Sequence, residues 1–358
     1  MELGGKMDDL LKTGTIDITP AMLRTIAEID EFKGAWAALG RLAPERLDKL
    51  RHVAAIESIG SSTRIEGVKL SDREIDRLLS KIDVTSFASR DEQEVAGYAA
   101  AMEAVFAHYD AIDLTENHIT QLHRDLLQYA DKDERHRGAY KTLDNHVEAF
   151  GPDGTSLGVV FETASPFETP AQMKALIAWT RATIDADELH PLIIIGVFVV
   201  VFLAIHPFQD GNGRLSRILT TLLLLRAGYG YVPYASLESA IERTKDDYYR
   251  ALRRTQATLR KDSAEWQHWL DYFLGALRSQ KRVLEEKIKR ERILLDNLSP
   301  LSLEILDIAR TQGRVTVAEA AKITATSRNT VKDHIRALNE SGYLCRHGAG
   351  RGTWYALA

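Results

Sequence analysis

The sequence has a single cysteine, Cys345, among its 358 residues. One thiol cannot form an internal disulfide framework, so a small fold held together by disulfides is excluded and a reducing, cytoplasmic compartment is expected. The first residues, MELGGKMDDLLKTG, lack a positively charged end followed by an apolar core. No secretory signal is therefore expected at the start of this sequence.

The sequence also lacks an apolar run long enough to cross a membrane. The longest run, residues 191–205, is shorter than the roughly 20 residues that a membrane-spanning helix needs. We expect a helix buried on all sides there, with a strand as the alternative because Ile and Val are abundant. The length of the run favours the helix, and no membrane partner is expected.

Neither sign of charge dominates the composition. The formal net charge is −5 and the isoelectric point is near 6.2. These values argue against a surface that binds nucleic acid over its whole extent, while a local basic patch stays open. No internal repeat is present, and the length is sufficient for two or three domains.

The segment IHPFQDGNGRLSR, residues 205–217, lies between two apolar stretches and is suited to binding an anion. Gly211 and Gly213 allow the positive φ values at which successive backbone N–H groups converge on one ligand. The following run, residues 215–225, is helical in character. Its N-terminus would face the same anion and add the helix dipole to the attraction.

Side chains of the same segment supply the remaining chemistry of a phosphate site. Arg214 and Arg217 lie three residues apart on the predicted helix, so both could hold a polyphosphate. Asp210 could hold a divalent cation that bridges phosphate oxygens, and His206 could act as a base near neutral pH. The alternative is a tight turn between two helices in which His206 is a core residue and Asp210 serves only the geometry of the turn.

The segment resembles the signature of the Fic family (filamentation induced by cyclic AMP), HPFx[DE]GNGRxxR, at every specified position. The resemblance implies a helical core over about residues 45–270. It also implies an enzyme that transfers AMP from ATP to a Ser, Thr or Tyr hydroxyl of a protein. ATP, Mg²⁺ and a protein target, which could be the chain itself, are the implied partners.

The resemblance assigns a role to each motif residue. It implies that His206 is the general base, that Asp210 ligates Mg²⁺, and that Asn212 lies near the α-phosphate. Arg214 would hold the β-phosphate and Arg217 the γ-phosphate. The full set of residues implied to bind ATP is Glu66, His206, Gly211, Asn212, Gly213, Arg214, Leu215, Ser216, Arg217, Tyr248 and Gln256, of which Gly211, Asn212 and Gly213 form the anion hole.

The sequence Ser62-Thr63-Arg64-Ile65-Glu66-Gly67 resembles the inhibitory motif of the same family, [ST]xxxE[GN]. A helix over about residues 57–67 could place the Glu66 carboxylate against Arg217, which the γ-phosphate needs. Ser62 lies four residues earlier on the same face, and Gly67 completes the motif. The alternative is an ordinary ion pair at the surface, worth about 0–1 kcal/mol.

The resemblance also implies residues of a flap and of an adenine pocket. Residues 138–150 resemble the β-hairpin flap that aligns the target by strand addition, with His146 and Val147 as the contact residues. Tyr248 and Gln256 fall where the family builds its adenine pocket. Alternatively, Tyr248 is an ordinary packed aromatic residue and Gln256 is an amide at the surface.

Hydrophobic periodicity and capping residues predict a mainly α-helical chain. A helix from residue 43 past Ile56 is followed by a short break at Ser and Gly residues and a helical turn ending at Gly67. A capping box over residues 71–74 opens a further helix, and residues 135–170 are irregular with a β-hairpin. Other helices are predicted over residues 19–32, 91–109, 115–127, 170–186, 191–205, 214–226, 246–260 and 263–296.

The C-terminal residues 299–358 resemble a winged helix-turn-helix domain. The predicted helices are residues 301–309, 317–323 and 328–338, followed by two strands around a glycine-rich wing. Residues 314–351 contain seven Lys or Arg against three Asp or Glu. Arg328, Asn329, Lys332 and Arg351 are candidate DNA contacts. The alternative is a domain that binds protein.

The predicted fold is thus a Fic-type helical bundle with a small β-hairpin flap and a C-terminal winged helix-turn-helix domain. The predicted boundaries are 1–110 for an N-terminal helical region, 111–275 for the catalytic core, 276–298 for a connecting helix and 299–358 for the winged domain.

Two functional alternatives remain at this stage. The same site could remove AMP from a modified protein, with Glu66 orienting a water. Alternatively, the helical body could sense a nucleotide while the winged domain regulates transcription. The resemblance further implies a homodimer.

Overall fold

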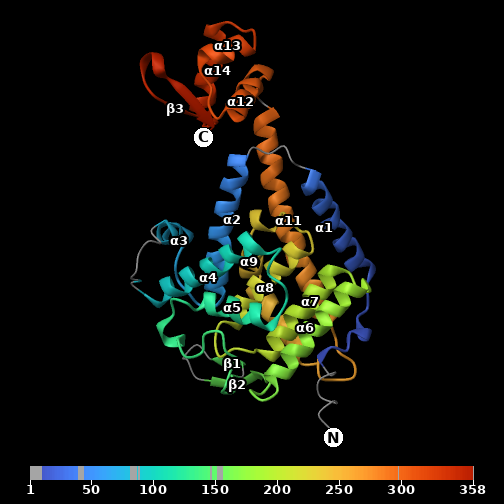
Figure 1. The fold of residues 1–358 in the computed structure, drawn as a ribbon. Helices are drawn as coiled ribbons and strands as arrows, with labels where there is room; N and C mark the ends of the chain where they lie inside the picture. The colour runs from blue at the N-terminus through green and yellow to red at the C-terminus, as the bar shows by residue number, and fades with distance from the viewer. Residues whose placement is uncertain are drawn as a thin grey trace. The chain divides into compact units, whose positions relative to one another are not determined.

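The computed structural model describes residues 10–38, 44–80, 87, 89–145, 147–150, 156–296 and 298–357. These residues form a mainly helical protein with two small antiparallel sheets (Figure 1). The helices are α1 (Pro20–Ala38), α2 (Pro44–Ile65), α3 (Asp72–Leu79), α4 (Arg90–His108), α5 (Glu116–Leu126), α6 (Thr169–Ala186), α7 (Pro191–Ile205), α8 (Asn212–Arg226), α9 (Leu237–Arg243), α10 (Lys245–Gln256), α11 (Gln267–Asp296), α12 (Pro300–Gln312), α13 (Val317–Ile323) and α14 (Arg328–Glu340). The strands are β1 (Val147–Phe150), β2 (Ser156–Phe161), β3 (Leu344–His347) and β4 (Trp354–Leu357).

The chain divides into two compact units. The first comprises Met1–Leu39 with Arg51–Lys281, and the second comprises Gly40–Leu50 with Arg282–Ala358. The motif at residues 205–217, the inhibitory motif and the hairpin all belong to the first unit, so one unit contains every residue of the predicted nucleotide site.

Helix α7 forms the centre of the first unit, because residues 192–205 are buried without exception. It packs against α6, α8 and α10, which cover the apolar surface that its Ile and Val residues present on every side. The prediction of a buried helix is therefore confirmed, and the strand alternative is wrong. In the parts of the chain that the structure describes, every helix is too short or too polar to cross a bilayer.

Three features of the first unit differ from the prediction. Helix α1 continues to Ala38, six residues beyond the predicted end at Phe32, and the short helix α9 was not predicted. The predicted break after Ile56 is wrong, because α2 runs without interruption to Ile65. A Cβ atom at Gly60 would lie 2.6 Å from Arg64 Nη1 and 2.6 Å from Asp72 Oδ1. Gly60 thus serves close packing of polar side chains, and these tertiary contacts outweigh its low helix propensity.

Strands β1 and β2 form the predicted hairpin, with irregular register between Val147 and Glu148 and between Ala149 and Phe150. Val147 is the first residue of β1, whereas His146 lies outside the described residues. Irregular pairing of this kind leaves a strand bent and locally incomplete in its hydrogen bonding.

The second unit contains the predicted winged helix-turn-helix fold. Helices α12, α13 and α14 and strands β3 and β4 enclose a core of their own, and Val315 pairs with Tyr355 to extend the wing sheet. Thr316 and Glu319 form a capping box at the start of α13, and Ser327 caps α14. The core is formed by Ile305, Leu306, Ile308, Ala309, Val315, Ala320, Val331, Ile335, Leu338 and Leu344.

Candidate active site

The loop between α7 and α8 is shaped by two residues in the left-handed region. His206 caps the C-terminus of α7 with a φ of 53°, and Gly211 caps the N-terminus of α8 with a φ of 81°. Helix α8 therefore begins at Asn212, and its first N–H groups point into the loop, as an anion site requires. The left-handed conformation predicted for Gly211 is confirmed.

Gly213 has a different role from the one predicted. It lies inside α8 and is absent from the residues with positive φ in the described chain. A Cβ atom there would collide with Glu66 Oε1. Gly213 is needed for space, because the Glu66 carboxylate lies directly against the first turn of α8.

His206 is half-buried in the loop, and its Nδ1 lies 3.3 Å from the Leu203 carbonyl oxygen. That oxygen can only accept, so the contact favours the tautomer with the proton on Nδ1 and leaves Nε2 as a proton acceptor. Burial lowers the pKa of His206 to about 4, and the nearby charge of Lys141 acts in the same direction. The imidazole is therefore neutral at physiological pH and able to accept a proton.

Asn212 closes the loop through its side chain. Its Oδ1 accepts from the Phe208 N–H at 2.9 Å, and its Nδ2 donates to the Phe208 carbonyl at 2.7 Å. Both ends of the buried amide are engaged, and the second N–H of Nδ2 and the backbone N–H of Asn212 stay available as donors to a phosphate.

Arg214 is buried and lies between two carboxylates. Its Nη1 is 2.9 Å from Glu94 Oε2, and its Nη2 is 3.1 Å from Asp210 Oδ2. Arg90 joins the same network through a 2.7 Å contact with Glu94 and a 3.6 Å contact with Asp210. Arg90 and Glu94 were not among the predicted site residues, because only the packing of α4 against α8 brings them to the motif.

Arg217 is held by the inhibitory motif. Its Nε donates to Ser62 Oγ at 2.8 Å, and its Nη2 donates to the Ser62 carbonyl at 3.0 Å and to Glu66 Oε1 at 2.7 Å. Burial works against the charge of Arg217, yet the carboxylate of Glu66 keeps its pKa raised. The structure thus brings Ser62, Glu66 and Arg217 together, and Gly67 ends the segment with a φ of 107°.

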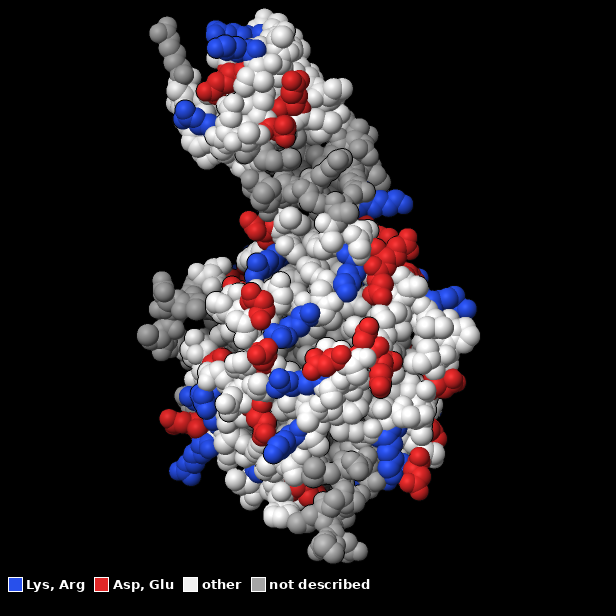
Figure 2. Space-filling view, turned by 45° about the vertical axis from the view of Figure 1, so that its right-hand side comes forward, with Lys and Arg blue, Asp and Glu red and all other residues white. Residues whose placement is uncertain are grey.

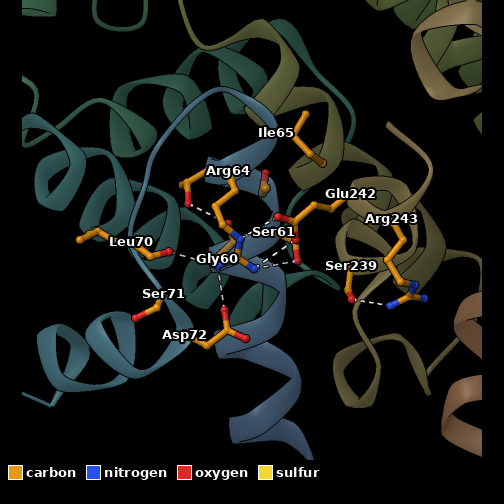
Figure 3. Close-up of polar contacts among 12 residues, drawn as sticks. Gly60, Ser61, Arg64, Ile65, Leu70, Ser71, Asp72, Ser239, Glu242 and Arg243 are labelled. Atoms are coloured by element: carbon orange, nitrogen blue, oxygen red, sulfur yellow. Dashed lines mark hydrogen bonds and ion pairs between the residues drawn. The ribbon is translucent and has the colours of Figure 1, made fainter. Parts of the chain in front are cut away.

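Arg64 anchors this inhibitory segment to the surrounding helices (Figure 3). Its Nε donates to Glu242 Oε1 at 2.7 Å and its Nη2 to Glu242 Oε2 at 3.1 Å, while its Nη1 donates to Asp72 Oδ1 at 2.8 Å. Lys245 adds a 2.7 Å hydrogen bond to the Ile65 carbonyl. The C-terminal end of α2 is therefore held by α3, α9 and α10 at once.

The other predicted nucleotide contacts are buried, at positions of different character. Burial raises the pKa of Tyr248, while hydrogen bonds with Arg217 and Ser216 oppose the rise, so its hydroxyl lies beside the arginine end of the site. Leu215 faces the core with no exposed surface, and Ser216 donates to the Gly213 carbonyl. Gln256 is the last residue of α10 and is largely buried, so the surface-amide alternative is wrong.

Asp210 is the residue predicted to hold the metal ion. Among the described residues, no group of three or more His, Cys, Asp or Glu could hold a metal by itself. Mg²⁺ in nucleotide enzymes usually takes only one or two carboxylates and completes its shell with phosphates and water. Asp210 lies in the loop between α7 and α8, and its side chain is 41% exposed. This exposure fits a cation that arrives with its nucleotide.

The structure places the four candidate DNA contacts in two elements of the winged domain. Arg328, Asn329 and Lys332 are exposed on the N-terminal half of α14, the position of a recognition helix. Arg351 belongs to a short 3-10 turn in the wing, Gly350–Gly352.

Two family models match the chain. Residues 113–224 match the Fic/DOC family, and residues 298–344 match a winged helix-turn-helix DNA-binding domain. Two proteins named protein adenylyltransferase Fic, from Drosophila grimshawi and Drosophila virilis, are each 28% identical to this chain over 208 residues. The matched region covers 58% of this chain but only 40% of each relative.

Solved structures share the fold. The crystal structure of a Fic family protein from Desulfovibrio desulfuricans is 25% identical with a TM-score of 0.64, over 96% of this chain and 97% of that one. A Fic domain containing signaling protein from Bacteroides thetaiotaomicron is 24% identical with a TM-score of 0.58, over 72% of this chain and 95% of that one, a likeness of fold. The chain therefore carries a Fic/DOC domain in residues 113–224, followed by a winged helix-turn-helix domain that includes residues 298–344.

Proposed function

We propose that this chain is a protein adenylyltransferase that transfers AMP from ATP to a Ser, Thr or Tyr hydroxyl of a protein. The observation that carries the proposal is the Glu66 carboxylate, which lies against Gly213 at the first turn of α8 and pairs with the buried Arg217. A carboxylate held there marks a site built for an anion, next to a neutral imidazole. The names of the curated relatives support the same activity.

In the proposed reaction His206 Nε2 takes the proton of the target hydroxyl as its oxygen attacks the α-phosphorus. The bond from the α-phosphorus to the bridging oxygen breaks, and pyrophosphate leaves. The Leu203 carbonyl holds the proton on Nδ1, so Nε2 stays available as the acceptor. The N–H groups at the start of α8, together with Arg214 and Arg217, stabilise the negative charge on the phosphates.

Asp210 is proposed to hold Mg²⁺ against the phosphates. When bound, the cation would neutralise phosphate charge and so ease departure of pyrophosphate. Arg214 contacts Asp210 Oδ2 at 3.1 Å, so binding of a metal by that oxygen would release Arg214 toward the phosphates.

The same geometry supports autoinhibition. Glu66 Oε1 takes a hydrogen bond from Arg217 that a phosphate would otherwise receive, and its negative charge repels the phosphates. Ser62 uses two more donors of the same guanidinium. Nucleotide can bind productively only after Glu66 moves.

Labelled ATP tests this function directly. Purified chain is incubated with α-³²P-ATP, magnesium and a cell lysate, and labelled proteins are separated on a gel. Glu66→Gly should increase incorporation at least about 10-fold over the unchanged chain, since the charge-assisted hydrogen bond from Arg217 to Glu66 is lost and that donor becomes available to a phosphate. His206→Ala added to Glu66→Gly should abolish it, because the base is lost.

Glu103→Gly is the matched control, because Glu103 is an exposed carboxylate on α4. It should leave incorporation at the level of the unchanged chain. If Glu66→Gly also stays at that level, autoinhibition by Glu66 is wrong, and if the double variant with His206→Ala still labels, His206 is not the base.

The winged domain favours a second role, binding of DNA by the same chain. Arg328, Asn329 and Lys332 are exposed together on the helix at the recognition-helix position, and the matching family model is described as DNA-binding.

Removal of AMP from a modified protein is a further reaction open to the first site, with Glu66 orienting the attacking water. If the site removes AMP, the unchanged chain should release label from a modified target, and Glu66→Gly should not.

A further inference from the structure

Two residues ahead of the hairpin bind four consecutive carbonyl groups of the loop that carries His206. Lys141 Nζ donates to the Ile205 carbonyl at 3.1 Å, and the Lys141 backbone N–H donates to Pro207 at 2.9 Å. Asn145 Nδ2 donates to His206 at 3.3 Å and to Phe208 at 2.6 Å. The carbonyls of residues 205–208 are thus all held from one side by Lys141 and Asn145.

Lys141 is an unusual choice for a purely structural position. Its side chain is only 3% exposed, and its ammonium donates to Asn145 Oδ1 at 2.7 Å, Thr163 Oγ1 at 2.9 Å and the Ile205 carbonyl. All three acceptors are neutral, so no carboxylate in direct contact offsets the desolvation of the charge. An apolar residue would fill this space at lower cost, which points to a role in holding the loop.

The backbone of His206 needs such support. Its φ of 53° and ψ of 61° are costly for a residue with a Cβ, by about 1–3 kcal/mol, and persist only where surrounding contacts fix them. The bonds from Lys141 and Asn145 fall on the carbonyl of His206 and on those of both its neighbours. They therefore fix the peptide planes that set the direction of the imidazole.

The far end of the same loop is tied to the same segment by His123. The Gly138 N–H donates to His123 Nδ1 at 3.0 Å, so the ring carries its proton on Nε2 and donates it to the Asp210 carbonyl at 3.0 Å. The ring also stacks on Phe208 with centroids 3.8 Å apart. Residues 138–145 thus contact the His206 end of the loop directly and the Asp210 end through His123.

We propose that Lys141 and Asn145 are positioning residues, which hold His206 in its left-handed conformation and link its aim to the segment that enters the β1–β2 hairpin. The inference rests on the proposed function, because the orientation of the imidazole affects turnover only if His206 removes a proton. Neither side chain contacts the reacting atoms. Their loss should therefore impair turnover while leaving the binding of ATP intact.

The test uses the full chain carrying Glu66→Gly, with Lys141→Met, Lys141→Arg and Asn145→Ala added one at a time. Lys141→Met and Asn145→Ala should each lower kcat by about 10- to 100-fold, since small misplacement of a reacting group has effects of that size. The Kd for ATP should change less than about 3-fold, because Arg214 and Arg217 are untouched. Lys141→Arg keeps a charged donor and should retain more activity than Lys141→Met. Lys174→Met, an exposed lysine on α6, is the matched control and should match its parent.

A second measurement separates this inference from the proposed function. Titration of the His206 imidazole by NMR should show its pKa rising in Lys141→Met, because the nearby charge is gone and the ring is no longer held in its buried position. If the Glu66→Gly parent transfers no AMP, the proposed function fails while the titration still reports on positioning.

An unchanged kcat in Lys141→Met and Asn145→Ala despite loss of thermal stability, or an unchanged His206 titration in Lys141→Met, would overturn the inference. If Lys141→Met does not fold, Lys141→Arg is measured in its place. A kcat equal to the parent's with a shifted His206 pKa, or a lowered kcat with an unshifted His206 pKa, would contradict a link between the position of His206 and turnover.

Discussion

At the scale of single residues, the site consists of buried positive charges, each matched by a carboxylate. Arg214 lies between Glu94 and Asp210, and Arg217 is bound to Glu66. Both guanidiniums are at most 3% exposed, so each depends on its partner to offset desolvation. In the proposed function, nucleotide phosphates replace Glu66 and restore the same charge balance.

Glu94 shows how strongly the structure depends on this balance. Glu94→Ala should lower the free energy of unfolding by about 2–3 kcal/mol, because the buried Arg214 would lose one of its two carboxylate partners. Urea denaturation followed by tryptophan fluorescence measures the change. Asp247→Ala removes an ion pair with Arg250 whose side chains are 59% and 58% exposed, and should cost less than about 1 kcal/mol. Equal losses in the two variants would show that burial of the Glu94 pair is unimportant.

The pKa of His206 determines how activity depends on pH. A base works in its neutral form, so with His206 as the proposed base a pKa lowered to about 4 should preserve activity well below the pH range of an ordinary histidine. We expect kcat/KM of the Glu66→Gly variant, with saturating magnesium, to change less than about 2-fold between pH 7.5 and pH 5.5. A histidine of pKa 6.5 would lose about 10-fold over that interval. A half-maximal point near pH 6.5, in protein shown by circular dichroism to be folded, would contradict this expectation.

At the scale of elements, the proposed autoinhibition requires the end of α2 to move before nucleotide binds. Its last turn carries Ser62 and Arg64 and leads directly to Glu66. Two paired carboxylates bind Arg64 from outside the nucleotide site, namely Glu242 of α9 and Asp72 of α3 (Figure 3). The inhibited position of Glu66 therefore depends on contacts that ATP does not touch.

Loss of the Arg64 contacts should loosen the inhibitory segment. Arg64→Met should raise AMP incorporation by several-fold, up to about 10-fold but less than Glu66→Gly, since charge-assisted bonds at a partly exposed position contribute about 1 kcal/mol each. Incorporation of labelled AMP measures it, with His206→Ala as the blank. Arg243→Met is the matched control, because Arg243 is exposed on α9 and its Nη1 bonds only to Ser239 Oγ in the described structure. An Arg64→Met variant no more active than the control would place the restraint elsewhere.

At the scale of the whole molecule, charge does not favour one kind of partner. On the face shown in Figure 2, acidic and basic side chains are interspersed over the helical body, in keeping with the net charge of −5. DNA binding would therefore have to come from a local group of residues. The exposed residues Arg328, Asn329 and Lys332 on α14 are that group.

An electrophoretic shift with double-stranded DNA tests this role in the full chain. Replacing both Arg328 and Lys332 by Ala should weaken binding by about 10-fold or more. If both contact phosphates, the slope of log affinity against log salt should also become shallower by about 2. Arg243→Ala should bind as the unchanged chain does. Absence of a shift at low salt, or equal binding by the double variant, would leave the winged domain with a protein partner instead.

Much of the fold and part of the site could be predicted from local sequence. The buried helix α7, the capping box at α3, the winged domain and the left-handed Gly211 follow from periodicity and from residues with narrow conformational preferences. The pairing of Glu66 with Arg217 is what the resemblance of residues 62–67 and 206–217 to the two Fic motifs implies, and the structure has it. Features that depend on the local preference of a single residue can therefore be predicted from the sequence.

Close approach between segments distant in sequence was decided only by the tertiary structure. A glycine stands at position 60 inside a continuous helix because Arg64 and Asp72 occupy the space that a Cβ would fill. Gly213 leaves space for Glu66 and does not have a positive φ. Glu94 and Lys141 have no motif around them, and their partners are reached only when α4 meets α8 and when residues 138–145 meet the loop after α7. A hydrogen bond or an excluded Cβ depends on positions to within an ångström, which packing of the whole chain determines and local preference does not.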